Sequence, residues 1–480
     1  MAESLGNKAI KGTIWASIDR IGSMGLQFVV NIILARLLVP ADFGAIGMIM
    51  IFILVSQVFV DGGFNSALIQ RKEADQTDFS TIFFWNLGVG AIFYLIIFLC
   101  APLIAGYYEM PVLQPVLRVL GSILILNAVI SIQTTRLQKS LAFASLAAID
   151  IISSLIGGGI AVVMAMYGMG IWSLVVMMLS ISTVKIVMFY CVTRWRPSAV
   201  FSKESFRSLF NFGGYLFCAN LLQTACQNVQ GIIIGKRFSA SQMGYYSQAD
   251  KLNSISGYTL PQIIVQVMYP VYSQIQDDRE RLISTMLMNM RVIAFVIFPL
   301  LFLLILVAEP LIELLYGEAW LPAMPYFRIL CVGSVFMCLT NISYYGVAAV
   351  GRSRELFLWS FYKWGVLLAL LLTGMNFGMT ALMWSIVASN INIFMTNALL
   401  SRKWVGVGLM ALFRTVCPIG LLSTLLLGTL LMLPAAGITI HWLAQAALFV
   451  GLYAGTASGL RFRAVKETCE VLRRLRGSKR

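Results

Sequence analysis

Polar side chains recur at helical spacing in a stretch that is otherwise apolar enough to cross a membrane. Within residues 13–38, Arg20, Ser23, Gln27 and Asn31 occupy positions i, i+3, i+7 and i+11 of one helix face. Amide, hydroxyl and guanidinium groups form hydrogen bonds and are costly against lipid. This face is therefore expected to line a water-filled cavity or to bond to another helix.

A second stretch, residues 211–237, repeats the pattern. A shift of 200 residues brings its polar positions into register with the first stretch and sets Lys236 over Arg36 and Gly244 over Gly44. We interpret the two faces as the lining of a hydrophilic cavity, and the alternative is hydrogen bonding that joins two helix bundles. The residues predicted to line the cavity are Arg20, Ser23, Gln27, Asn31, Arg36, Asn220, Gln223 and Gln227.

Two arginines outside these stretches are also candidates for the site. Arg118 and Arg328 lie 210 residues apart, at matching positions near the predicted outer face. A guanidinium there either anchors its helix at the membrane interface or attracts an anionic substrate through paired donors.

Carboxylates within predicted spans are candidates for binding a coupling ion. They are Asp19, which Arg20 could simply neutralise, Asp61 before a Gly-Gly turn, and Asp250 beside Lys251. The structural alternatives are that Asp61 caps the turn and that Asp250 and Lys251 pair. We expect five other span charges to reach the membrane interface from positions near helix ends. These are Asp150, Lys185, Arg291, Lys363 and Arg414.

The elements that carry these residues are predicted to be membrane helices. The 480 residues are 59% hydrophobic and 11% charged, whereas soluble domains carry about 25% charged residues. Hydropathy and chain-breaking residues predict about fourteen spans with short connections. The predicted spans are residues 13–38, 42–60, 81–104, 116–135, 141–165, 170–192, 211–235, 243–273, 286–308, 323–350, 356–375, 378–400, 409–433 and 438–460.

Lysine and arginine lie almost entirely on one side of these spans. Twenty-four of the 35 fall on the side of the N-terminus, nine lie within spans, and only Lys236 and Arg237 fall on the opposite side. Cytoplasmic loops are enriched in Lys and Arg, so both termini are predicted to be cytoplasmic. The same bias explains the net charge of +15, and no nucleic-acid partner is expected.

The polar stretches belong to a longer internal repeat. PLIAGYY at Pro102 resembles PLIELLY at Pro310, and YGMG at Tyr167 resembles FGMT at Phe377. We predict an all-α polytopic membrane protein with two parallel six-helix bundles in a pseudo-two-fold relation. The predicted divisions are the bundles 1–205 and 206–405, an added helix pair 406–460 and a basic cytoplasmic tail 461–480 that lies on lipid.

Several other chemistries lack the residues they need. Eight cysteines are scattered without a CxxC pair, and the single histidine, His441, lies near a predicted helix end. This predicts neither a disulfide framework nor a metal site. No Walker loop or GxSxG motif is present.

The first apolar run lacks a signal-peptide cleavage site and is expected to be retained. Trp320 is predicted to anchor at the membrane interface.

Four segments together carry a family resemblance: ARLLVPADFGAIGM, DGGFNSALIQ, GYYSQADKL and PLIELLYGEAW. They resemble the lipid-linked oligosaccharide flippases of the polysaccharide transporter family, within the MOP (multidrug/oligosaccharidyl-lipid/polysaccharide) exporter superfamily. The likeness is greatest to the colanic-acid and teichuronic-acid exporter branch, and it covers essentially the whole chain.

The resemblance implies a V-shaped, MATE-like fold whose central cavity is lined by helices 1, 2, 7 and 8. It implies that an undecaprenyl-pyrophosphate-linked repeat unit crosses the bacterial inner membrane by alternating access, coupled to H⁺ or Na⁺ and without another cofactor. The implied partners are the lipid-linked oligosaccharide, membrane lipids, a polysaccharide polymerase and glycosyltransferases.

Two other functions are open at this point. A multidrug antiporter of the same superfamily would need acidic residues deep in the bundles, whereas basic residues outnumber acidic ones within the spans. A membrane polysaccharide polymerase or ligase would be expected to carry a large outer loop, and the connections here are short. A scaffold role leaves the charges within the spans unexplained.

Overall fold

The computed structural model of the chain describes residues 22–71, 74–433, 440–460 and 462–468. Every element in these residues is a helix, which confirms the all-α prediction. Contacts divide the chain into two units, residues 1–244 and 245–480, so the division falls inside α10 (Ala240–Ser254). The repeat boundary at 205/206 is a different division, and it stays a prediction.

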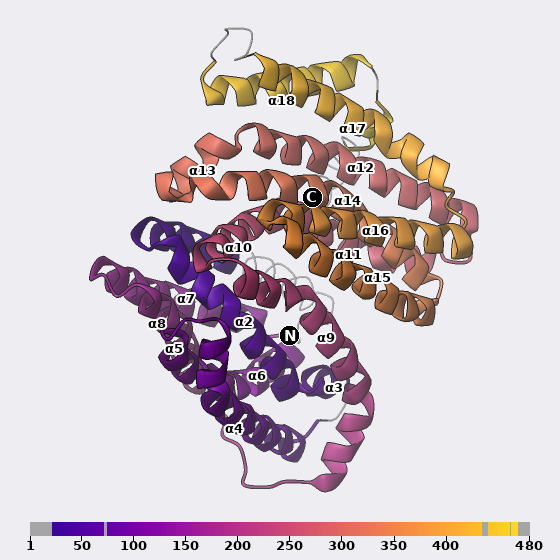
Figure 1. Cartoon of the computed structure of the whole chain (residues 1–480). Helices are drawn as coiled ribbons and strands as arrows, with labels where there is room; N and C mark the ends of the chain where they lie inside the picture. The colour runs from indigo at the N-terminus through magenta and orange to yellow at the C-terminus, as the bar shows by residue number, and fades with distance from the viewer. Residues whose placement is uncertain (1–21, 72–73, 434–439, 461, 469–480) are drawn as a thin grey trace. The chain divides into compact units, whose positions relative to one another are not determined.

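Unit 1 consists of the helices drawn in indigo to magenta in Figure 1. Within it α7 and α8 run side by side, and α2 packs on both α4 and α9. Its helices are Gly22–Leu37, α2 (Pro40–Asp61), α3 (Phe64–Gln70), α4 (Gln76–Tyr107), α5 (Leu113–Leu120), α6 (Ile123–Lys139), α7 (Phe143–Met166), α8 (Ile171–Thr193), α9 (Lys203–Arg237) and the first turn of α10.

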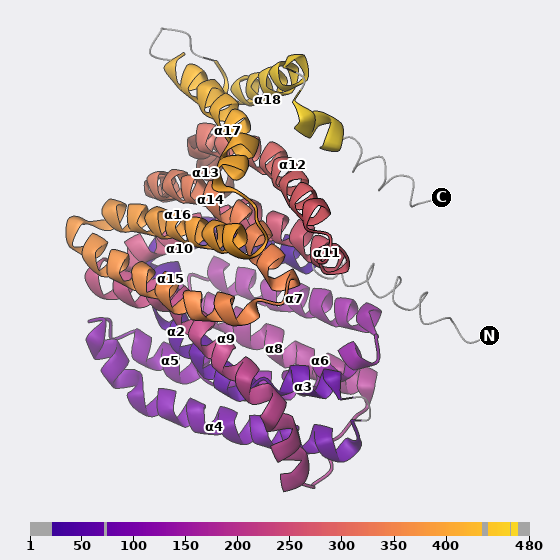
Figure 2. The same cartoon turned by 90° about the vertical axis from the view of Figure 1, so that its right-hand side faces the viewer.

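Unit 2 contains the remainder of α10 and the helices that follow it. Within it α14 packs along both α12 and α16, and α17 packs on α12 (Figure 2). Its elements are η1 (Ile255–Thr259), α11 (Leu260–Gln274), α12 (Arg279–Leu306), α13 (Ala308–Tyr316), η2 (Glu318–Ala323), α14 (Met324–Ala349), α15 (Ser353–Gly374), η3 (Met375–Phe377), α16 (Met379–Trp404), α17 (Leu409–Met432) and α18 (Trp442–Gly459).

Each of the fourteen predicted spans coincides with a helix or a run of helices in the described residues. Ten segments are long and apolar enough to cross a membrane. The helix Gly22–Leu37, α9, the α10–α11 run and α18 fall outside these ten because they are shorter or more polar. The first three are the helices whose polar stripes and charges the sequence singled out.

Local sequence signals explain several of the helix ends. Gly62 and Gly63 both have positive φ, so the predicted turn after Asp61 is confirmed. A capping box starts α4, because the Asp75 side chain accepts from the backbone N–H of Asp78 and the Asp78 side chain accepts in return. His441 caps the start of α18.

The prediction for Trp320 was wrong. Its side chain is fully buried in η2 and packs against the rings of Tyr245 and Tyr316. A tryptophan next to an outer loop is therefore part of the core of unit 2 rather than an anchor at the membrane surface.

The closest backbone approach in unit 1 joins the first turns of α2 and α10. A Cβ atom at Gly44 would lie 1.7 Å from the carbonyl oxygen of Ala240, and one at Gly244 would lie 1.9 Å from that of Pro40. Only hydrogen atoms fit between these backbones. Gly44 and Gly244 are also the two glycines that the 200-residue shift superimposes, so the matching turns of the repeat cross each other at a glycine pair.

We expect Gly44→Ala to destabilise the protein, because the added methyl group would force α2 and α10 apart. Overpacking of this kind costs about 1–3 kcal/mol. Gly88→Ala is the matched control, since a Cβ atom there meets no atom within 4 Å. Thermal unfolding of the purified protein should show a lower melting temperature for Gly44→Ala only. Equal melting temperatures for the two variants would contradict the glycine crossing.

Candidate functional site

The predicted site residues on the first helix do not share one environment. Asp19 and Arg20 lie outside the described residues. Gln27 is exposed, Ser23 is partly buried, and Asn31 is buried with 5% of its surface exposed. The helix packs on α7, where a Cβ atom at Gly158 would lie 2.7 Å from a methyl group of Val30. The predicted stripe therefore divides between an exposed part and a part that packs inside unit 1.

Four amides of the predicted stripes are exposed, namely Gln27 on the first helix and Asn220, Gln223 and Gln227 on α9. No hydrogen bond between described residues holds any of these four side chains. The alternative interpretation, that these amides join helices, is therefore not supported for the described part of the chain. The amides are available to water or to a polar ligand.

Asp61 lies in a hydrogen-bonded cluster of neutral groups between α2, α3 and α6. Its carboxylate accepts from Gln57 Nε2 at 3.2 Å and from Ser131 Oγ at 3.3 Å. Ser131 and Thr135 also lie within hydrogen-bond distance of Asn65 Oδ1. No cation pairs with Asp61 among the described residues. The residues that we call the Asp61 cluster are Gln57, Asp61, Asn65, Asn127, Ser131 and Thr135.

Most of this cluster was missed from the sequence, although a signal for it was present. Asn127, Ser131 and Thr135 follow one another at intervals of four residues, so they lie on one face of α6. That face meets α2 and α3 in the structure. The polar stripe on α6 is as visible in the sequence as the stripes of the first helix and α9, and it could have predicted this cluster.

Unit 2 holds a corresponding cluster without a carboxylate. Asn341 Nδ2 donates to Gln262 Oε1 at 2.9 Å, and Gln262 Nε2 donates to the hydroxyl of Tyr345 at 3.2 Å. Gln262 lies 201 residues after Asp61, one more than the shift that relates Gly44 to Gly244. The π-helical turn η1 lies between Gly244 and Gln262, and a π turn closes on i+5 instead of i+4. It accounts for the additional residue.

Arg118 and Arg328 both bond to backbone carbonyls of neighbouring helices. Arg118 Nε donates to the carbonyl oxygen of Phe98 at 3.5 Å, and Arg328 Nε donates to that of Ile305 at 3.2 Å. Pro102 has no N–H, so the Phe98 carbonyl lacks the partner that an α-helix would supply. Ile305 lies in the last turn of α12, where carbonyls also lack helical partners. Each arginine therefore satisfies a carbonyl that its neighbouring helix leaves without a helical partner.

Other charges within spans also find local partners. Lys185 Nζ lies 2.7 Å from Asp150 Oδ1, and Arg291 forms a salt bridge of 2.7 Å with Glu467. Lys363 is buried, with 6% exposed, and its Nζ donates to Asn397 Oδ1 at 3.2 Å.

The expectation that Lys363 reaches the interface was wrong, because its ammonium group is enclosed by α14, α15 and α16. Of the other charges considered, Arg414 is exposed, as are Asp250 and Lys251 on α10. A surplus of basic residues within the predicted spans is therefore not sufficient evidence for a cationic cavity.

Comparison with known proteins assigns the chain to a family. The family described as "Polysaccharide biosynthesis protein" matches residues 33–325. The chain is 25% identical to the teichuronic acid biosynthesis protein TuaB of Bacillus subtilis, over 74% of each chain. It is 27% identical to the succinoglycan biosynthesis transport protein ExoT of Rhizobium meliloti, over 73% of this chain and 71% of that protein. It is 26% identical to the lipopolysaccharide biosynthesis protein WzxC of Escherichia coli, over 70% of this chain and 69% of that protein.

Two solved structures have a similar fold. The lipid II flippase MurJ in an inward closed conformation superimposes with a TM-score of 0.74 at 14% identity, over 94% of this chain and 99% of MurJ. An inward-facing multidrug resistance MATE transporter of the MOP superfamily superimposes with a TM-score of 0.64 at 15% identity, over 84% of this chain and 99% of the transporter. Both comparisons agree with the predicted MATE-like fold.

We expect the role of Arg118 to depend on Pro102. Arg118→Gln should lower the free energy of unfolding by about 0.5–1.5 kcal/mol, the range for a typical hydrogen bond, because the Nε–O distance is 3.5 Å. Pro102→Ala restores a backbone N–H for the Phe98 carbonyl, so the same substitution should cost less in that background. A double-mutant cycle of unfolding measures the coupling. The control is Arg328→Gln, whose cost should be the same with Pro102 or Ala at that position, and an uncoupled Arg118 would refute the assignment.

Proposed function

Because the chain belongs to the polysaccharide biosynthesis protein family, we propose that it is a flippase for lipid-linked oligosaccharides. It moves repeat units carried on undecaprenyl pyrophosphate across a bacterial inner membrane for surface polysaccharide synthesis, by alternating access and with both termini in the cytoplasm. The observation that carries the proposal is the set of exposed, unbonded amides at Gln27, Asn220, Gln223 and Gln227.

The physical argument starts from the environment of these amides. An amide without a hydrogen-bond partner costs several kcal/mol in hydrocarbon, so the face that carries them borders water. Sugar hydroxyl groups replace water at amides with little loss, because both donate and accept hydrogen bonds. The saccharide therefore passes along the amide faces, while the lipid tail stays in the bilayer.

The names of the relatives support this substrate class. ExoT is named as a succinoglycan biosynthesis transport protein, and MurJ as a lipid II flippase. In this chain Arg36 on the first helix is exposed and lies near the predicted outer end of its polar stripe. We propose that it and Arg20 contact the pyrophosphate. Glycosyltransferases and a polysaccharide polymerase are the proposed functional partners.

Asp61 is the proposed site of ion coupling. An ionised carboxylate that lacks a cation is unfavourable at bilayer depth, and Asp61 has only neutral hydrogen-bond partners among the described residues. Binding of a proton or a sodium ion removes this cost. Transport coupled to either ion would then change the charge inside the Asp61 cluster once in each cycle.

A multidrug antiporter is the alternative function, and the substrate assay separates the two. Purified protein in vesicles should translocate a fluorescent lipid-linked oligosaccharide across the bilayer. Deletion of the gene should abolish surface glycan and leave drug resistance unchanged. Normal glycan combined with altered drug resistance would favour the antiporter instead.

We expect Gln223→Ala combined with Gln227→Ala to reduce glycan translocation about thirtyfold, because each lost amide removes hydrogen bonds worth about 1 kcal/mol to the sugar. The control removes two exposed amides, one at the end of α11 and one in the turn after it, Gln274→Ala with Gln276→Ala, and should translocate normally. Protein levels should be equal in all variants. Unchanged translocation in the α9 variant would remove the observation on which the proposal depends.

We expect Asp61→Asn to abolish the stimulation of translocation by an ion gradient, because the amide keeps the hydrogen-bonding shape but binds neither H⁺ nor Na⁺. Transport is measured in vesicles with a proton gradient, a sodium gradient or neither. Asp277→Asn, an exposed turn carboxylate, is the control. If the variant still responds fully to the gradient, Asp61 is not the coupling site.

A further inference from the structure

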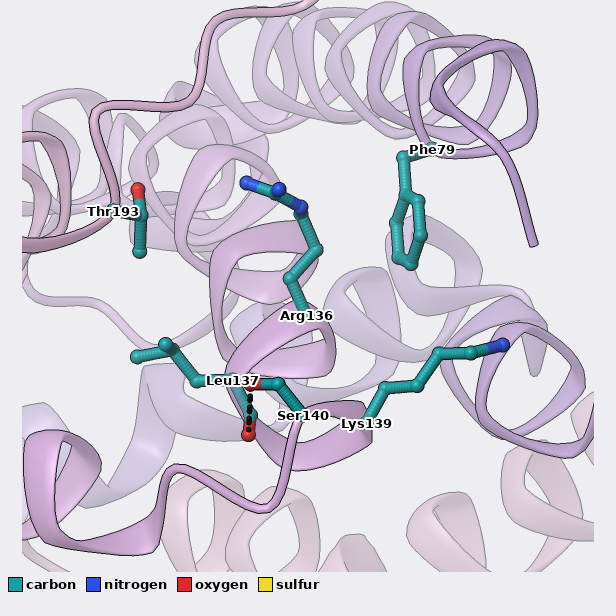
Figure 3. Close-up of a pocket in the computed structure, with 6 residues that line it drawn as sticks. All are labelled: Phe79, Arg136, Leu137, Lys139, Ser140 and Thr193. Carbon is teal, nitrogen blue, oxygen red and sulfur yellow. Dashed lines mark hydrogen bonds between the residues drawn. The ribbon is translucent and has the colours of Figure 1, made fainter. Parts of the chain in front are cut away.

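A basic cavity lies at the ends of several helices of unit 1, and its residue Arg136 directly follows Thr135 of the Asp61 cluster on α6. It has a volume of about 350 Å³ and is lined by Phe79, Arg136, Leu137, Lys139, Ser140 and Thr193 (Figure 3). This volume lies at the lower end of the range for small-molecule sites, about 300–1,000 Å³. The proposed function makes no use of this cavity.

The lining residues all come from helix ends. Phe79 is in the first turn of α4, Arg136 and Lys139 are in the last turn of α6, and Thr193 ends α8. Each of these helices belongs to a segment long and apolar enough to cross a membrane. Their ends therefore meet at one edge of the bilayer, at the depth of lipid headgroups.

The guanidinium group of Arg136 is held between aromatic rings. Its Cζ atom lies 4.9 Å from the ring centre of Trp195 and 5.7 Å from that of Phe79. Both rings are fixed in a buried apolar cluster with Ile82, Phe83 and Ile132. Aromatic stacking holds the plane of the guanidinium group and leaves its N–H edge free to bind an oxyanion.

No carboxylate neutralises Arg136 within the described part of the chain. The nearby Asp78 is already paired with Arg71, at 3.0 Å. Lys139 Nζ donates to the carbonyl oxygens of Leu68 and Arg71, and Asp78 also attracts its charge. One carboxylate is therefore shared by Arg71 and Lys139. The end of α6 contributes a partial charge of about −0.5, which offsets only part of the two positive charges.

An unpaired donor lies beside the cavity. Thr193 Oγ1 donates to Gln133 Oε1 at 3.0 Å. The Gln133 side chain is fully buried, and its Nε2 finds no acceptor among the described residues. A buried amide N–H without a partner costs about 1–3 kcal/mol. The region of the cavity therefore has an excess of positive charge and of hydrogen-bond donors, and an anion in the cavity would offset the positive charge.

We propose that this cavity binds the phosphate group of an anionic membrane lipid. The two cations that line the cavity recognise phosphate oxygens, and basic pockets between membrane helices at the headgroup level bind anionic lipids. The stacked Arg136 is the residue that holds the phosphate. Lys139 adds charge, and the site is independent of the transport pathway.

The test is a binding measurement on the purified full-length protein, with short-chain phosphatidylglycerol, short-chain phosphatidylcholine and inorganic phosphate as separate probes. We expect phosphatidylglycerol to bind more tightly than the other two. Arg136→Gln should weaken its binding about tenfold, the loss of one charge-assisted pair of hydrogen bonds. Arg402→Gln with Lys403→Gln removes two charges from the last turn of α16 in unit 2 and should leave binding unchanged.

Two outcomes would overturn the proposal. Equal binding by Arg136→Gln and the unsubstituted protein would show that the cavity does not hold the phosphate. Inorganic phosphate that binds as tightly as the lipid would assign the cavity to a free anion. If Arg136→Gln fails to fold, Arg136→Lys keeps the charge but loses the planar donors, and it should still weaken lipid binding. Because the readout is binding, a failure of the proposed flippase activity would not affect the result.

Discussion

The structure depends on one constraint, that a polar group at bilayer depth finds its partner inside the protein or borders water. Arg118 donates to the Phe98 carbonyl that Pro102 leaves unpaired, and Arg328 does the same at the end of α12. Lys185 pairs with Asp150, and Lys363 donates to Asn397. These basic groups are satisfied locally. They stabilise helix packing within a unit, so their presence says little about what the protein transports.

The polar groups that have no partner inside the described part of the protein are the ones that indicate function. The amides of Gln223 and Gln227 are exposed and unbonded among the described residues, although α9 has the length of a membrane span. Arg136 carries a charge that no described carboxylate balances. The amides indicate a wet path for a neutral polar solute, and the arginine indicates an anion at the headgroup level. One physical criterion therefore separates two sites with different chemistry.

The sequence predicted the helices well, because apolar length and chain breakers are local properties. It predicted the turn at Gly62 and Gly63 for the same reason. It could not predict that Asn31 is buried while Gln27 is exposed, since both lie on one stripe and the difference comes from packing in unit 1. Nor could it predict the partner of Arg118, because a free carbonyl on α4 becomes relevant only once α5 packs beside it. Side-chain partners are set by tertiary contacts, and these are not local.

The two halves of the repeat differ at the position where charge matters most. Asp61 and Gln262 each bond to a polar residue of the long helix that packs against them, Ser131 and Asn341 respectively. The shapes of the two clusters are similar, but only the first contains a group that can change its charge. A neutral amide cannot respond to a proton or a sodium ion, so of these two clusters an ion would act only on the one in unit 1. A protein with nearly matched halves would in this way gain the asymmetry that a directed cycle requires.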